Sequence, residues 1–172
     1  MIVIGIDPGL TGAIACLDHH GEVRLIADIP VMQRASGKAA IKNQVSPAGL
    51  LEVLQICRQD DGAIQLMVLI EKAQPMPGMI KGNPKAQRSA TTFSLGLSAG
   101  LIEGVIAAAG YPHELVHPAT WKAKLKPGKD KEAARAMAIR LYPGAAGQLG
   151  RVKDHNRAEA LLLAHYGRQL YH

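Results

Sequence analysis

Two carboxylates, Asp7 and Glu71, stand at the ends of short apolar segments, where they could act together. The apolar run at residues 1–6 leads into Asp7, and the apolar run at residues 66–70 leads into Glu71. If the two runs form adjacent strands that finish at the same edge of a sheet, their carboxylates lie side by side. Close carboxylates repel each other unless a cation lies between them, and hard oxygen ligands suit Mg²⁺ or Mn²⁺. A pair of such ions can promote phosphodiester cleavage, so these two residues predict metal-dependent chemistry on a phosphodiester.

A third acidic element lies near the end of the sequence. From Ala158 onward the sequence is apolar with helical character, so Glu159 is out of place there if it only packs. His155 and Glu159 are four positions apart, and one face of a helix would bring both to a single ion. Asp154 is either a helix N-cap or a metal ligand, and the residues alone leave both possibilities open.

Basic residues flank these acids in three clusters, and the formal net charge of +6 favours a polyanionic partner. Lysines neutralise phosphates, and Trp121 could stack on a base or a sugar. The alternative for Trp121 is an aromatic side chain that covers the sheet. The predicted DNA contacts are Lys72, Lys81, Lys85, Arg88, Trp121, Lys122, Lys124, Lys129 and Lys131.

A mixed sheet would bring the acids together. Three short strands joined by tight turns predict an antiparallel meander, and the continuous apolar run before Glu71 predicts a buried central strand. The expected strands are residues 1–6, 13–17, 23–29, 66–70 and 114–116, and the expected helices are 47–58, 89–109, 118–124, 131–141 and 156–168. Residues 34–44 are small and polar and predict a loop. This order indicates one α/β domain over residues 1–172, a five-stranded mixed sheet with helices on both faces.

Gly96, Gly100 and Gly104 recur at helical spacing within the long predicted helix. Each glycine costs about 1 kcal/mol of helix stability relative to alanine, so close packing should compensate. The neighbour is either the sheet or the same helix of a second subunit.

No apolar run approaches the roughly 20 residues of a membrane span, and the first apolar run is too short for a signal peptide. We therefore expect a cytoplasmic protein.

The motifs together resemble the RuvC-type Holliday-junction resolvases. They are a strand ending in Asp-Pro-Gly, a second strand ending in Glu, and a helix carrying acid-x-x-x-Glu-Ala-Leu, and the resemblance runs from Ile4 to about Tyr166. It implies an RNase H-like fold, a homodimer, and two Mg²⁺ ions per active site, for which Mn²⁺ substitutes. It also implies paired nicks in a four-way DNA junction, with the basic segment after the second strand inserted at the junction centre.

The resemblance carries over catalytic and metal-binding roles to Asp7, Glu71 and Glu159, with His155 or Asp154 as the fourth ligand. The family more often has Asp at the position of Glu159, with Asp or His three or four residues earlier. Helical geometry favours His155. The form with Glu looks like the branch found in phages and related bacterial or organellar enzymes.

Three other functions use part of the same pattern. An RNase H-like nuclease of other branched-DNA or RNA specificity needs the same acids, and a non-catalytic junction-binding protein needs only the lysines. Asp-Pro-Gly followed by Thr11-Gly12 also resembles the first phosphate loop of actin- and hexokinase-like ATPases. That function requires a second glycine-rich loop, which this sequence lacks.

Overall fold

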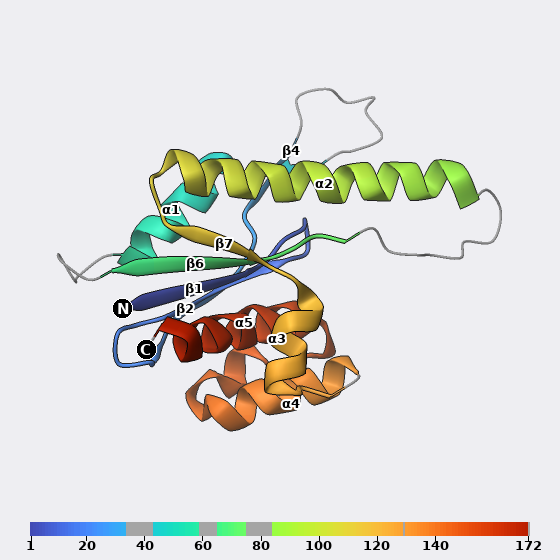
Figure 1. Cartoon of the computed structure of the whole chain (residues 1–172). Coiled ribbons are helices and arrows are strands. Elements are labelled where there is room, and N and C mark those ends of the chain that lie inside the picture. Colours follow the sequence, from blue (N-terminus) through green and yellow to red (C-terminus); the bar gives the residue numbers. More distant parts are fainter. Residues whose placement is uncertain (34–42, 59–64, 75–83, 129, 172) are drawn as a thin grey trace.

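A computed structural model describes residues 1–33, 43–58, 65–74, 84–128 and 130–171, without the side chains of residues 84–91. Its centre is a five-stranded sheet with the strand order β3-β2-β1-β6-β7 (Figure 1). The strands are β1 (Ile2–Asp7), β2 (Ala13–Leu17), β3 (Val23–Asp28), β6 (Leu66–Glu71) and β7 (His113–Val116). The first three pair antiparallel, whereas β1 with β6 and β6 with β7 are parallel. The predicted mixed sheet is confirmed.

Helices cover both faces of this sheet, as Figure 1 shows, with α1 and α2 on one face and α3, α4 and α5 on the other. The helices are α1 (Pro47–Arg58), α2 (Pro84–Ala108), α3 (Pro118–Leu125), α4 (Lys131–Leu141) and α5 (His155–Tyr171). Ser46 caps α1, since its Oγ accepts a hydrogen bond from the Gly49 N–H at 3.2 Å. No helix within the described ranges is long and apolar enough to cross a bilayer.

Side chains of β1 alternate between two cores because successive residues of a strand point to opposite faces. Ile2, Ile4 and Ile6 are buried on the side of α1 and α2. Val3 is buried on the side of α5, with Leu69 of the neighbouring strand. The carboxylate that ends β1 is therefore mounted on a strand that is held from both sides.

Two predicted boundaries are wrong. β4 (Val31–Gln33) and β5 (Asn43–Val45) form a small antiparallel sheet, so part of the predicted loop is a strand, and residues 34–42 lie outside the described ranges. The long helix begins at Pro84 instead of residue 89, because proline is favoured in the first turn of a helix. Lys85 and Arg88, which precede the predicted helix, therefore belong to α2.

Helix α5 lies directly against β1 at Gly5. A Cβ atom built on Gly5 would be 2.2 Å from the Ala160 carbonyl oxygen and 2.5 Å from the Ala164 nitrogen. Backbone atoms cannot retreat as a side chain can, so only glycine permits this approach. Gly5 thus sets the separation between the strand that carries Asp7 and the helix that carries Glu159.

The three glycines of α2 show the opposite situation. A Cβ atom at Gly96, Gly100 or Gly104 would meet nothing within 4 Å. Of the two possible neighbours, the sheet is therefore excluded at these positions. Contact with a second subunit stays a prediction.

These environments predict opposite effects of the same substitution. Gly5→Ala forces a methyl group into the backbone of α5 and should destabilise the protein by about 1–3 kcal/mol or more. Gly100→Ala, the matched control, should stabilise the monomer by about 0.5–1 kcal/mol, because the helix gains propensity and no atom of the same subunit lies within 4 Å of the added methyl group. Urea unfolding followed by circular dichroism measures both changes, and equal stability of the two variants would contradict the close approach at Gly5.

Candidate functional site

Asp7 and Glu71 lie at the same edge of the sheet. β1 and β6 are parallel neighbours, and Ile6 pairs with Ile70, so the residue that follows each one stands at the carboxyl end of its strand. The juxtaposition predicted from the two apolar runs is confirmed. The next residue, Lys72, donates its backbone N–H to the Val116 carbonyl at 2.8 Å, which fixes the end of β6 against β7.

Glu159 joins this pair from α5. Burial raises the pKa of Asp7 to about 8, and the negative charges of Glu71 and Glu159 add to the rise. Burial also raises the pKa of Glu71. The structure thus gathers three carboxylates from β1, β6 and α5, and their mutual repulsion calls for positive charge among them.

Lys122 of α3 supplies part of that charge. Its Nζ lies 2.8 Å from Oε1 of Glu159. Burial opposes ionisation of Lys122, but the hydrogen bond and the charge of Glu159, with those of Glu71 and Asp7, raise its pKa overall. The ammonium group therefore stays charged and partly neutralises the cluster. The sequence suggested only a phosphate contact for this lysine.

Trp121, the neighbouring residue, binds a different carboxylate. Its side chain is completely buried, and the indole Nε1 donates a hydrogen bond of 2.8 Å to Oε2 of Glu71. Of the two possibilities for Trp121, the structure agrees with the aromatic side chain that covers the sheet, because the ring is buried in the core with Leu69 and Val116. A buried ring does not favour the predicted stacking on a base or sugar.

His155 is the first residue of α5 and reaches the cluster through Lys131. Its Nδ1 lies 3.2 Å from the Val152 carbonyl, and its Nε2 lies 2.8 Å from the Lys131 ammonium. Since a carbonyl and an ammonium can bind only a donor and an acceptor respectively, the proton is on Nδ1. A histidine that binds a metal through Nε2 uses this tautomer. Lys131 also lowers the pKa of Asp7 from its burial-raised value.

Asp154 is bound by Arg151 in this structure, so its catalytic or metal-binding role stays a prediction that this geometry does not support. Its buried carboxylate accepts the backbone N–H of Arg151 at 2.8 Å and the Arg151 guanidinium at 2.7 Å. These bonds lower the pKa of Asp154 to about 2. The carboxylate closes the 3₁₀ turn η2 (Val152–Asp154), which leads into α5.

The donor chemistry of the cluster fits a hard divalent cation, since carboxylate oxygens and one imidazole nitrogen are available. In the described part of the chain, however, no three His, Cys, Asp or Glu side chains are close enough together to hold a metal ion. Lys122 and Lys131 bind two of the candidate ligands directly. Coordination by Glu159 or His155 would require each side chain to release its lysine and to move closer to the other ligands.

Two contacts that the sequence did not predict fix the start of α5. Asn156 donates its side-chain amide to the Thr11 carbonyl at 2.5 Å, in the turn that follows Asp7. Arg157 forms a bidentate pair with Asp28 at the end of β3, at 2.6 and 2.8 Å. Pairs this distant in sequence leave no local pattern.

The predicted DNA contacts are described only in part. Lys72, Lys124 and Lys131 are exposed, and Lys131 is close enough to Asp7 to lower its pKa. Lys81 and Lys129 fall outside the described residues, and the side chains of Lys85 and Arg88 are not described.

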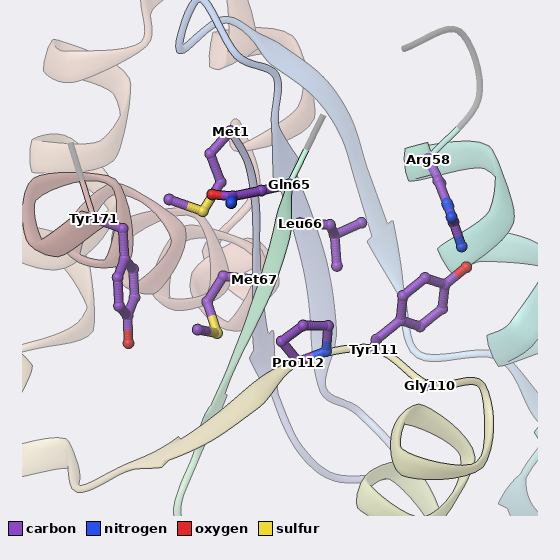
Figure 2. A pocket seen from close by; sticks show the side chains of 9 residues that line it. All are labelled: Met1, Arg58, Gln65, Leu66, Met67, Gly110, Tyr111, Pro112 and Tyr171. Atoms are coloured by element: carbon purple, nitrogen blue, oxygen red, sulfur yellow. The ribbon is translucent and has the colours of Figure 1, made fainter. Parts of the chain in front are cut away.

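A cavity of about 510 Å³ lies at the opposite end of the sheet. It is lined by Met1, Arg58, Gln65, Leu66, Met67, Gly110, Tyr111, Pro112 and Tyr171 (Figure 2). These residues include the amino ends of β1 and β6, whereas the acids lie at the carboxyl ends. None of the predicted site residues lines this cavity, so it is separate from the acidic cluster.

Known structures identify the fold. A structure of T. thermophilus RuvC in complex with a Holliday junction substrate is similar with a TM-score of 0.54 and 20% sequence identity, over 99% of this chain and 97% of that chain. A structure of Thermus thermophilus RuvC is similar with a TM-score of 0.46 and 22% identity, over 98% and 96%. No family model and no curated protein matches the sequence. The similarity to the first structure shows that the chain has the RNase H-like fold of RuvC.

The raised pKa of Asp7 predicts that this residue destabilises the metal-free protein at high pH. Its ordinary pKa of 3.8 applies to the unfolded chain, and the folded value is about 8, so stability is lost as the pH rises from about 4 to 8. Asp7→Asn should therefore be more stable than wild type at pH 8 by about 1 kcal/mol or more, or roughly 2–4 °C in Tm. The difference should vanish near pH 4.

Thermal unfolding in EDTA measures this effect. Asp154→Asn is the matched control with the opposite sign, because a pKa lowered to about 2 contributes stability that is present at neutral pH and lost only below about pH 4. If the Asp7→Asn protein is no more stable than wild type at pH 8, the pKa of Asp7 is not raised in the folded protein.

Proposed function

We propose that this protein is an endonuclease that resolves four-way (Holliday) DNA junctions by paired, metal-dependent nicks. The observation that carries the proposal is the gathering of Asp7, Glu71 and Glu159 at one edge of an RNase H-like sheet. Carboxylates that repel one another and are partly buried lower the free energy of unfolding. Their presence at one site therefore favours a catalytic or binding role that requires them. The order of the three motifs and the shared fold with a RuvC that was solved with a junction support the junction as substrate.

Asp7, Glu71, Glu159 and His155 would hold two Mg²⁺ ions, with Mn²⁺ as a substitute. When bound, such ions supply activation of a water and neutralisation of charge on the phosphate. The protein's own residues hold the carboxylates at the sheet edge and keep positive charge beside them. Lys122 and Lys131, once exchanged for metal, become free to contact the phosphate that enters the site.

Lys72 and Lys124 extend this positive surface away from the cluster. Both are exposed, one directly after Glu71 and one on α3. Ammonium groups at such positions bind phosphates without regard to sequence, as recognition of a branched shape requires. Lys81, Lys85, Arg88 and Lys129 are near these residues in sequence and are proposed as further contacts.

A symmetric junction has two equivalent strands to cut, so we propose a homodimer with twofold symmetry. α2 offers a suitable face, because Gly96, Gly100 and Gly104 leave its backbone uncovered. Phe93, on the same helix, is 63% exposed. The same helix of a second copy could approach this face closely.

The nicking assay tests the proposal. Purified protein with Mg²⁺ should nick a labelled four-way junction but not the matching linear duplex, and EDTA should abolish nicking. Asp7→Asn and Glu159→Gln should lose more activity than the roughly 10–100-fold typical of an outer-shell change, while still binding the junction. On a plasmid that extrudes a cruciform, a dimer should produce linear DNA and a monomer nicked circles.

The alternatives give other results in this assay. Tight junction binding without nicks in Mg²⁺ or Mn²⁺ would overturn the catalytic proposal and leave a junction-binding protein. Equal cleavage of flaps or RNA hybrids would keep the nuclease and overturn the substrate.

Lys124→Ala should weaken junction binding and make it less dependent on salt. Loss of one phosphate contact lowers the slope of log K against log salt concentration by about 1. Fluorescence anisotropy between 50 and 200 mM salt, roughly the range in which such contacts dominate, measures the slope. Glu132→Ala serves as a surface control on α4, and an unchanged slope for Lys124→Ala would remove this lysine from the interface.

A further inference from the structure

Trp121 is the only tryptophan in the chain. Its side chain is the largest of the fully buried side chains that the structure describes. It packs in the core between the sheet and α5, with Leu69, Val116 and Leu162 in the same cluster. An indole N–H in such a place needs a hydrogen-bond acceptor. The acceptor is Oε2 of Glu71, 2.8 Å away.

The start of α3 and its attachment to β7 fix the position of Trp121. α3 follows β7 directly, with Pro118 at its first position and the His117 Nδ1 accepting a hydrogen bond from the Ala119 N–H at 3.2 Å. β7 pairs with β6 at Val116 and Glu71. Glu71 and Trp121 are therefore connected in two ways. One connection runs through β7 and α3, and the other is the hydrogen bond between the indole and the carboxylate.

Glu71 needs such a restraint. Its side chain has three rotatable bonds, it stands at the end of a strand, and it is only partly buried. The N–H of Trp121 restrains one carboxylate oxygen and, because it donates, favours the ionised carboxylate. Oε1 receives no hydrogen bond from Trp121 and stays available for another partner.

We propose that Trp121 is a positioning residue, whose indole N–H holds Oε2 of Glu71 so that Oε1 is directed to a divalent cation. This inference rests on the proposed metal site but not on the junction as substrate. Metal ligands are commonly oriented by such outer-shell hydrogen bonds, and their loss costs about 10–100-fold in metal affinity. The aromatic ring adds packing, but the N–H is the functional group.

The experiment replaces the N–H and keeps the ring. Because Trp121 is the sole tryptophan, growth of a tryptophan auxotroph on benzothienylalanine changes this residue alone, with sulfur in place of N–H. Trp121→Phe removes the N–H by mutation. Electron paramagnetic resonance of free Mn²⁺ gives the affinity without reference to activity, and both variants should bind Mn²⁺ about 10–100-fold more weakly than wild type.

Tyr171→Phe is the matched control. Tyr171 also donates from an aromatic side chain to a glutamate, with its hydroxyl 2.6 Å from Oε2 of Glu114, but it lies at the cavity end of the sheet. Its loss should leave Mn²⁺ affinity unchanged. Circular dichroism and thermal unfolding establish that each protein is folded at the assay temperature.

The outcomes separate the claims. Wild-type affinity in the folded sulfur analogue would overturn the inference, and tighter binding would do so too, because it would mean that the indole competes with the metal. A wild-type protein that binds no Mn²⁺ at millimolar concentration overturns the inference together with the metal site. Normal Mn²⁺ binding that depends on the N–H, without junction nicking, would support the inference and overturn only the proposed function.

Discussion

At Gly5 the backbone of α5 lies against the backbone of β1, where a methyl group would be 2.2 Å from the Ala160 carbonyl oxygen. Asp7 is two residues along the strand, and Glu159 is next to Ala160. The absence of one side chain therefore fixes how close two carboxylates from distant parts of the sequence can come. The sheet register then adds Glu71, since parallel pairing of β1 and β6 leaves their carboxyl ends at one edge.

Three carboxylates held in this way repel each other, and α3 is the element that makes the arrangement tolerable. Its adjacent residues Trp121 and Lys122 bind two different acids, one by a neutral N–H and one by an ammonium. The lysine contributes positive charge beside Glu159, and the indole N–H orients the carboxylate of Glu71. A short helix can do both because consecutive helical residues point about 100° apart, here toward the core and toward α5.

Patterns within one element and the shared edge of two apolar strands could be predicted from the sequence, whereas the individual side-chain partners could not. The two strand ends placed Asp7 and Glu71 correctly because apolar runs define a strand and its edge. The bonds between Asp154 and Arg151 could not be predicted, because they depend on the geometry of the turn that the two residues close. For Trp121 the sequence left both a stacking contact and a side chain that covers the sheet open. Its lysine neighbours suggested exposure, and the buried acceptor that decides for the core belongs to a distant part of the sequence.

Because α5 packs on β1 and is synthesised after the strands, the acidic cluster is completed late in translation. At about 5–20 residues per second, a ribosome reaches Glu159 roughly 8–30 s after Asp7. During that interval the first strands can pair, but the helix that completes the cluster has not emerged. A nascent chain beside cellular nucleic acid therefore lacks one of its three carboxylates, and the set becomes complete only when α5 docks.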